Sequence, residues 1–182
     1  MARYDSTKAR AAAIKKNIET ILETSNHQQC MGADKIIAIC QKNALAATVV
    51  EDLKDVDTAG AVLEYTHFSL TGNLGKKRGL LRRIGHYVEP LLQDADLKGS
   101  YSWLIKDLGC CLNSLHIRHN NKEGDKANAV AQAMSDRELE ECYDNTYREM
   151  LLLIELQKNL PFHRKVEGLR EQLDGKKDGR KG

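Results

Sequence analysis

The segment KKRGLLRRIGHYVEPLL, residues 76–92, sets the fold class because its apolar and charged residues repeat with the period of an α-helix. Leu80, Ile84 and Val88 recur at every fourth position and would share one side of that helix. Pro90 predicts the end of the helix or a kink, since proline lacks an N–H donor and its ring clashes with the preceding turn. We therefore expect an amphipathic helix over residues 76–89.

The same spacing recurs along most of the chain. It predicts further helices over residues 6–25, 33–53, 55–70, 100–118, 127–133, 135–160 and 162–174. Ser135 and Glu138 form the capping-box pattern that starts a helix, and residues 26–32 and 120–126 are expected to be loops. The sequence thus predicts an all-α fold: a compact bundle of five to seven helices, with a short disordered basic C-terminal tail.

Length and composition agree with one folded domain. The chain has 182 residues, of which 41% are hydrophobic and 30% charged, which is typical of globular proteins. We expect a single helical domain over residues 1–174 and a flexible basic tail over 175–182. The second predicted helix carries Ile37, Cys40, Ala44 and Ala47 as its buried stripe, with small residues on more than one face. These small residues, together with the wholly apolar run at 150–154, predict a homodimer.

The chain carries no signal for a membrane or for secretion. Its N-terminus is polar, without the apolar stretch of a signal peptide, and its longest strongly apolar run is far shorter than the ~20 residues that span a bilayer. The five cysteines form no Cys-x-x-Cys pair, which predicts free thiols in a reducing compartment. We therefore expect an intracellular, cytoplasmic protein without a membrane partner.

Cations are concentrated in one part of this nearly neutral chain. No acidic residue occurs between Tyr65 and Val88. On a helix, Arg78, Arg82 and His86 would form a row with steps of ~6 Å, which can follow a phosphate backbone. The predicted nucleic-acid-binding residues are Lys76, Lys77, Arg78, Arg82, Arg83 and His86.

These residues predict a non-enzymatic nucleic-acid-binding or assembly protein. RNA is favoured over DNA because no motif that enters the DNA major groove is present. The usual catalytic signatures, such as the phosphate-binding loop and the nucleophile elbow, are absent from the sequence, and no cofactor is expected. The competing structural interpretation is that the cations pair with the acidic helix over residues 135–158.

Two alternative functions rest on other residues. The acidic 135–158 helix could serve a protein–protein adaptor. A metal-binding helical protein is the other alternative, and its candidate zinc ligands are the pairs His27 with Cys30 and His116 with His119. One Glu-x-x-His pair, Glu64 with His67, matches half of a di-iron ligand set.

Overall fold

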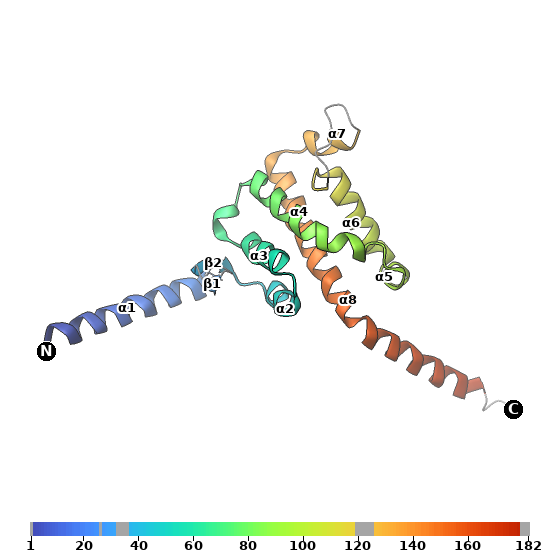
Figure 1. Cartoon of the computed structure of the whole chain (residues 1–182), viewed down its shortest axis with the longest axis horizontal. Coiled ribbons are helices and arrows are strands. Elements are labelled where there is room, and N and C mark those ends of the chain that lie inside the picture. Colours follow the sequence, from blue (N-terminus) through green and yellow to red (C-terminus); the bar gives the residue numbers. More distant parts are fainter. Residues whose placement is uncertain (1, 26, 32–36, 119–125, 179–182) are drawn as a thin grey trace. The chain divides into compact units, whose positions relative to one another are not determined.

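Eight α-helices and one antiparallel β-hairpin make up the part of the chain that the computed structural model describes, which is residues 2–25, 27–31, 37–118 and 126–178 (Figure 1). The predicted all-α class is confirmed, since the hairpin is small. Contacts group the chain into two units, Met1–Leu80 and Leu81–Gly182. The boundary lies inside helix α4 (Leu74–Leu91), and the single domain over 1–174 stays a prediction.

The first unit starts with helix α1 (Ala2–Thr24), which is followed by strands β1 (His27–Met31) and β2 (Ile37–Gln41). The strands pair antiparallel, with His27 opposite Gln41. Helices α2 (Ala44–Asp52) and α3 (Val56–Tyr65) follow, and then a 3₁₀ turn (Phe68–Leu70). The buried residues of this unit include Val49, Ala61, Val62 and Leu80.

The predicted helix over 33–53 is confirmed only in its second half, as α2, and the predicted loop over 26–32 is wrong. Strand β1 occupies most of the loop, and β2 occupies the part of the expected helix that carries Ile37 and Cys40. Asn43 decides where α2 begins, because its side-chain Oδ1 accepts a hydrogen bond from the N–H of Ala46 at 3.0 Å. Ala47, expected in the buried stripe, is exposed, and Ala46 is buried instead.

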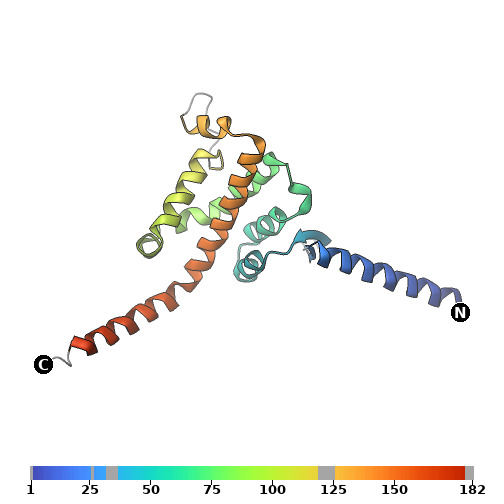
Figure 2. The ribbon, with the colours of Figure 1, turned by 180° about the vertical axis from the view of Figure 1, so that it is seen from behind.

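The second unit is built on α4, α6 and α8. After α4 come α5 (Ala95–Ser100), α6 (Ser102–Ser114), α7 (Lys126–Ala133) and α8 (Asp136–Asp178). Figure 2 shows α6 beside the first half of α8, in agreement with their contacts. The fully buried residues of the unit come from all three helices; they include Leu81, Ile84, Leu104, Leu108, Leu112, Met150, Leu151 and Leu153.

A glycine lets the three helices approach closely. A Cβ atom at Gly85 of α4 would lie 3.6 Å from the Leu112 side chain of α6 and 3.8 Å from the Met150 side chain of α8. These are ordinary contact distances, so a methyl group is accommodated and a longer side chain is not. Gly79, two turns earlier on α4, has no neighbouring atom within 4 Å of its Cβ position.

Two ends of predicted helices differ from the structure. The predicted helix over 100–118 corresponds to α6, which begins at Ser102 after the short helix α5. It ends at Ser114, two residues before His116, which takes a left-handed backbone conformation with φ of 59°. The predicted break at Pro161 is wrong, since α8 continues through it to Asp178. Of the predicted tail, residues 179–182 lie outside the described residues.

The close approach at Gly85 predicts a contrast between two substitutions on one helix. Gly85→Leu should lower stability by about 1–3 kcal/mol, because the added atoms overpack the junction of α4, α6 and α8. The matched control Gly79→Leu should leave stability unchanged or raise it, since leucine favours helix over glycine by up to ~1 kcal/mol. Thermal melts of both variants measure the difference, and equal melting temperatures would contradict the packing argument.

Candidate functional site

The first cations of α4 are engaged within their own unit. Lys76 forms an ion pair with Glu64, with 2.8 Å between Nζ and Oε1. Lys77 is buried, and its Nζ lies 5.5 Å from the centre of the Tyr65 ring, which is a cation–π contact. Lys77 is thus engaged with Tyr65 within its own unit, and its contact with a phosphate backbone stays a prediction.

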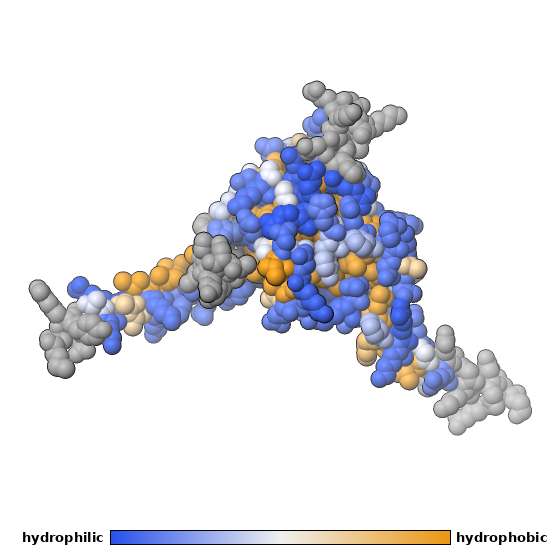
Figure 3. Space-filling view, viewed as in Figure 1, coloured by the Kyte–Doolittle hydropathy of each residue, from blue (hydrophilic) through white to orange (hydrophobic). Residues whose placement is uncertain are grey.

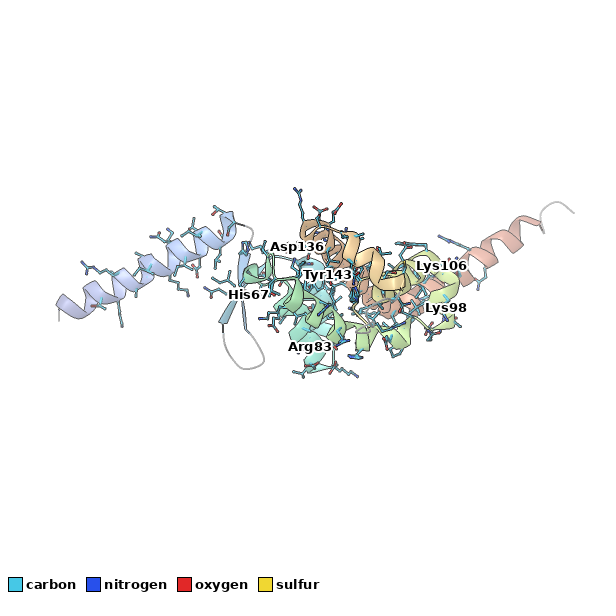
Figure 4. All side chains as sticks on the ribbon, turned by 90° about the horizontal axis from the view of Figure 1, so that it is seen from above. His67, Arg83, Lys98, Lys106, Asp136 and Tyr143 are labelled. Carbon is cyan, nitrogen blue, oxygen red and sulfur yellow. The ribbon has the colours of Figure 1, made fainter. Side chains whose placement is uncertain are left out.

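Arg82 forms hydrogen bonds with the segment that follows α6. Its Nε donates to the carbonyl of Ile117 at 3.2 Å, and its Nη2 lies 3.5 Å from the carbonyl of Arg118. Carbonyls just beyond a helix end lack partners within the helix and need donors from elsewhere. Tyr143 acts alike, since its hydroxyl donates to the carbonyl of Leu115 at 3.3 Å; Figure 4 labels this side chain within the second unit. Arg82 is half-buried, and its part in nucleic-acid binding stays a prediction.

A second ion pair fixes the same segment. Nε of Arg118 lies 2.6 Å from Oε1 of Glu89 on α4, and its Nη1 donates to Oδ1 of Asn113 at 3.3 Å. The Arg118 carbonyl thus lies near Arg82, and the Arg118 guanidinium lies near Glu89. The side chain of Arg118 therefore runs along the face of α4 that also carries His86. The structure brings together Arg82 and the segment of His116, two candidates that the sequence treated as separate.

The predicted cationic row is therefore not uniform. Arg78 and His86 are exposed, and Arg83 is half-buried. Nucleic-acid binding by residues 76–86 stays a prediction, and the side chains best placed for it are Arg78 and His86.

The candidate metal ligands do not form a site among the described residues, where no group of three or more His, Cys, Asp or Glu side chains could hold a metal ion. His27 and Cys30 lie on strand β1, where an odd spacing puts the two positions on opposite faces. His116 is half-buried, and His119 lies outside the described residues. Nδ1 of His67 lies 2.7 Å from the Ser69 hydroxyl, whereas Glu64 pairs with Lys76.

The acidic half of α8 uses several of its carboxylates locally. The predicted capping box is confirmed: Glu138 accepts hydrogen bonds from the N–H and hydroxyl of Ser135, and these bonds lower its pKa. Glu141 pairs with Arg137 at 3.1 Å, one turn away. Glu155 accepts a hydrogen bond from the Asn159 side chain at 2.9 Å.

One carboxylate of α8 is poorly solvated. The Oε2 atom of Glu149 is buried and has no hydrogen-bond partner among the described residues. Burial raises the pKa of Glu149, and the negative charge of Asp107 raises it further. The neighbouring Cys111 also has a raised pKa, chiefly from burial, against which a hydrogen bond with Thr146 acts.

An apolar stripe lies uncovered on the second half of α8. Leu160 is the last buried residue among those of the helix whose side chains are described. Beyond it Phe162, Val166 and Leu169 follow at spacings of four and three. Phe162 is 69% exposed, Leu169 is 51% exposed, and Val166 is half-buried. These three residues are called the α8 seam below. Figure 3 shows hydrophobic atoms along this part of the helix.

A groove opens beside the α8 seam. It has a volume of about 230 Å³ and is lined by Tyr101, Asn159, Phe162, His163, Val166, Glu167 and Arg170. Tyr101 stands at the start of α6, and its ring meets the His163 ring edge-on at a centroid distance of 6.0 Å. Arg164, on another side of the helix, pairs with Asp96 next to a second groove of about 460 Å³. The seam is thus held on a helix that is tied to α5 and α6.

A similar stripe lies on α1 in the first unit. Ile14, Ile18 and Ile21 follow one another at spacings of four and three and are exposed, at 60%, 42% and 63%; we call them the α1 seam. Leu22 alone is buried among residues 7–24. Figure 3 shows apolar atoms along this helix as well. Spacing of three and four therefore marks two exposed apolar stripes, whose exposure the sequence analysis did not predict.

Comparisons with known proteins give no match: no family model, no curated protein and no solved structure is similar to this chain. Within the described part of the chain, every helix is too short or too polar to cross a membrane. The α8 seam, with the groove beside it, combines exposed large apolar side chains with a concave surface and is the candidate site.

The bonds of Arg82 predict that it stabilises the fold. Arg82→Gln should lower the free energy of unfolding by about 1–3 kcal/mol, because the Ile117 carbonyl, which belongs to a fully buried residue, loses its donor. Arg78→Gln removes an exposed cation from the same helix and should change stability by less than ~0.5 kcal/mol. Urea denaturation of both variants measures the contrast. Equal stabilities of the two variants would contradict the structural role of Arg82.

The environment of Glu149 predicts a pH-dependent stability. Its pKa is raised in the folded state, so the folded state binds the proton more tightly than the unfolded state does. The contribution of this group is therefore most favourable at acidic pH and is lost as the pH rises through the folded pKa. Glu149→Gln, which mimics the protonated form, should raise the melting temperature at pH ~8 and lose that advantage near pH ~4.

The matched control is Glu141→Gln, an exposed carboxylate on the same helix. Its stability difference from the parent protein should not follow the pattern of Glu149→Gln. A Glu149→Gln variant that is less stable than the parent at every pH would contradict the assignment.

Proposed function

We propose that this chain is a non-catalytic assembly protein that binds a helix of another protein along the α8 seam. The observation that carries the proposal is the exposure of Phe162 and Leu169 on one face of a helix that is continuous with the core of the second unit. Large apolar side chains in a row at helical spacing are the anchors by which one helix docks on another.

The energetics favour an occupied seam. Burying one such side chain yields ~1.5–3 kcal/mol, so three seam residues supply several kcal/mol before the entropic cost of association. The groove beside Phe162 adds shape, because a side chain of the partner can enter between Tyr101 and the seam. Exposed apolar rows rimmed by polar residues are typical of interaction sites.

Helix docking explains the fold around Pro161. Proline inside a helix costs ~3 kcal/mol, and α8 continues past it for more than four turns. Beyond this residue the described side chains of α8 are not buried. A partner that covers the seam supplies the tertiary packing from which most helices in proteins draw their stability.

The proposal predicts a seam-dependent binding of helices. The probe is a fluorescent synthetic helix of four heptads with Leu at positions a and d and Gln on both flanks, used below its self-association concentration. Full-length protein should bind it, and the double variant Phe162→Glu/Leu169→Glu should bind at least ~10-fold more weakly, because each substitution places a charge in an apolar contact. Fluorescence anisotropy measures both affinities.

The matched control is Gly168→Ala, on the same helix turn but outside the seam, where an added Cβ meets no atom within 4 Å. It should bind the probe like the parent protein. Far-UV circular dichroism verifies that all variants retain their helices, as expected for substitutions of exposed residues. Probe binding that the double variant retains in full would refute the proposal.

A further inference from the structure

We infer that the partner helix carries acidic residues on both sides of its apolar seam; this rests on the proposed function. The argument starts from the positions that flank the α8 seam. With Phe162 and Leu169 at heptad position d and Val166 at a, the flanking positions e and g are those that face a paired helix. Within residues 158–170 they hold Lys158, His163, Lys165 and Arg170, and no acidic residue.

The flanking cations are placed to reach a partner. Lys165 and Arg170 are exposed. Arg170 and His163 line the groove that also exposes Phe162, so an apolar side chain in the groove brings its neighbours close to both. The acidic residue nearest the seam, Glu167, lies one turn after His163 and 3.4 Å from its Nδ1. A carboxylate on the partner therefore meets cations along both edges of the seam.

The α1 seam has the same arrangement. With Ile14 and Ile21 at d and Ile18 at a, the flanking positions from residue 8 to residue 17 hold Lys8, Arg10, Lys15 and Asn17. The acidic residues of this helix, Glu19 and Glu23, lie at positions b and f, away from the pairing face. Two separate helices of one chain thus combine an apolar seam with basic edges.

This arrangement disfavours a second copy as the occupant. Parallel pairing brings e against g, and antiparallel pairing brings e against e and g against g. Pairing of α1 or α8 seams between copies therefore places lysines and arginines mainly against one another, and like charges at these positions select against a partner. A homodimer built on these seams is disfavoured, and a partner with glutamates or aspartates at the same positions is favoured.

The narrow width of the seam favours a protein helix over a lipid surface as its occupant. Each seam uses only positions a and d, the narrow stripe of helix pairs, whereas a helix lying on a membrane buries a broader apolar face. Glu167 on α8 and Glu19 and Glu23 on α1 would also be repelled by anionic lipids. The favoured occupant is therefore an acidic amphipathic helix.

The test compares two probes with identical seams. Both have Leu at a and d over four heptads; one has Glu at every e and g position, and the other has Lys. Full-length protein should bind the Glu probe about tenfold more tightly at ~50 mM salt, and the difference should shrink at ~500 mM salt, where the Debye length is several-fold shorter. Lys165→Glu/Arg170→Glu should reverse the preference, and Lys106→Glu, an exposed charge reversal on α6, should leave it unchanged.

Each remaining outcome has one meaning. Equal affinity for both probes overturns the acidic partner and leaves the proposed function standing. Binding of neither probe, nor of the Gln-flanked one, overturns both. Seam-dependent binding to phosphatidylserine vesicles without probe binding assigns the surface to a membrane and overturns both. A dimer in analytical ultracentrifugation that Phe162→Glu/Leu169→Glu abolishes makes a second copy the occupant and overturns the acidic partner.

Discussion

The close contact of α4 with α6 and α8 at Gly85 is the constraint on which the second unit depends. Because the Cβ position of Gly85 lies at contact distance from Leu112 and Met150, α4 runs near enough to the end of α6 for Arg82 to reach the Ile117 carbonyl. The left-handed turn at His116 then needs no glycine, since the surrounding bonds hold the segment. Packing and polar contacts thus support one another at the same junction.

The sequence predicted elements better than it predicted roles. Apolar spacing placed α3, α4, α6 and the first half of α8, and the capping box placed the start of α8, because these are local properties. Arg82 shows what local reasoning misses. Its role depends on a carbonyl 35 residues later in the chain, so spacing alone could not separate it from Arg78. The same holds for Lys77, whose burial follows from the position of Tyr65.

Other failures have a different physical origin. Ile37, Cys40, Ala44 and Ala47 fit a helical period, but Ile37 and Ile39 also alternate as in a strand, and the cap at Asn43 makes the helix begin at Ala44. Ile14, Ile18 and Ile21 have the predicted helical period and are exposed, because the period of a helical stripe does not determine what covers it. The seams on α1 and α8 were visible in the sequence as patterns, and their exposure was not.

Apolar burial and charge pairing at the seams contribute different amounts of binding free energy and have different roles. Burial of one seam side chain is worth ~1.5–3 kcal/mol, whereas an exposed charge pair is worth ~0.2–1 kcal/mol. The apolar residues must therefore supply the affinity for any partner, and the flanking cations can only choose among partners. Replacing the unfavourable Lys–Arg pairs against a second copy by favourable pairs with an acidic helix still changes the difference in binding free energy by about 1–3 kcal/mol, which suffices to favour one partner over another. In the proposed complex the apolar seam residues would therefore supply the affinity, and the flanking cations would favour an acidic helix over a second copy.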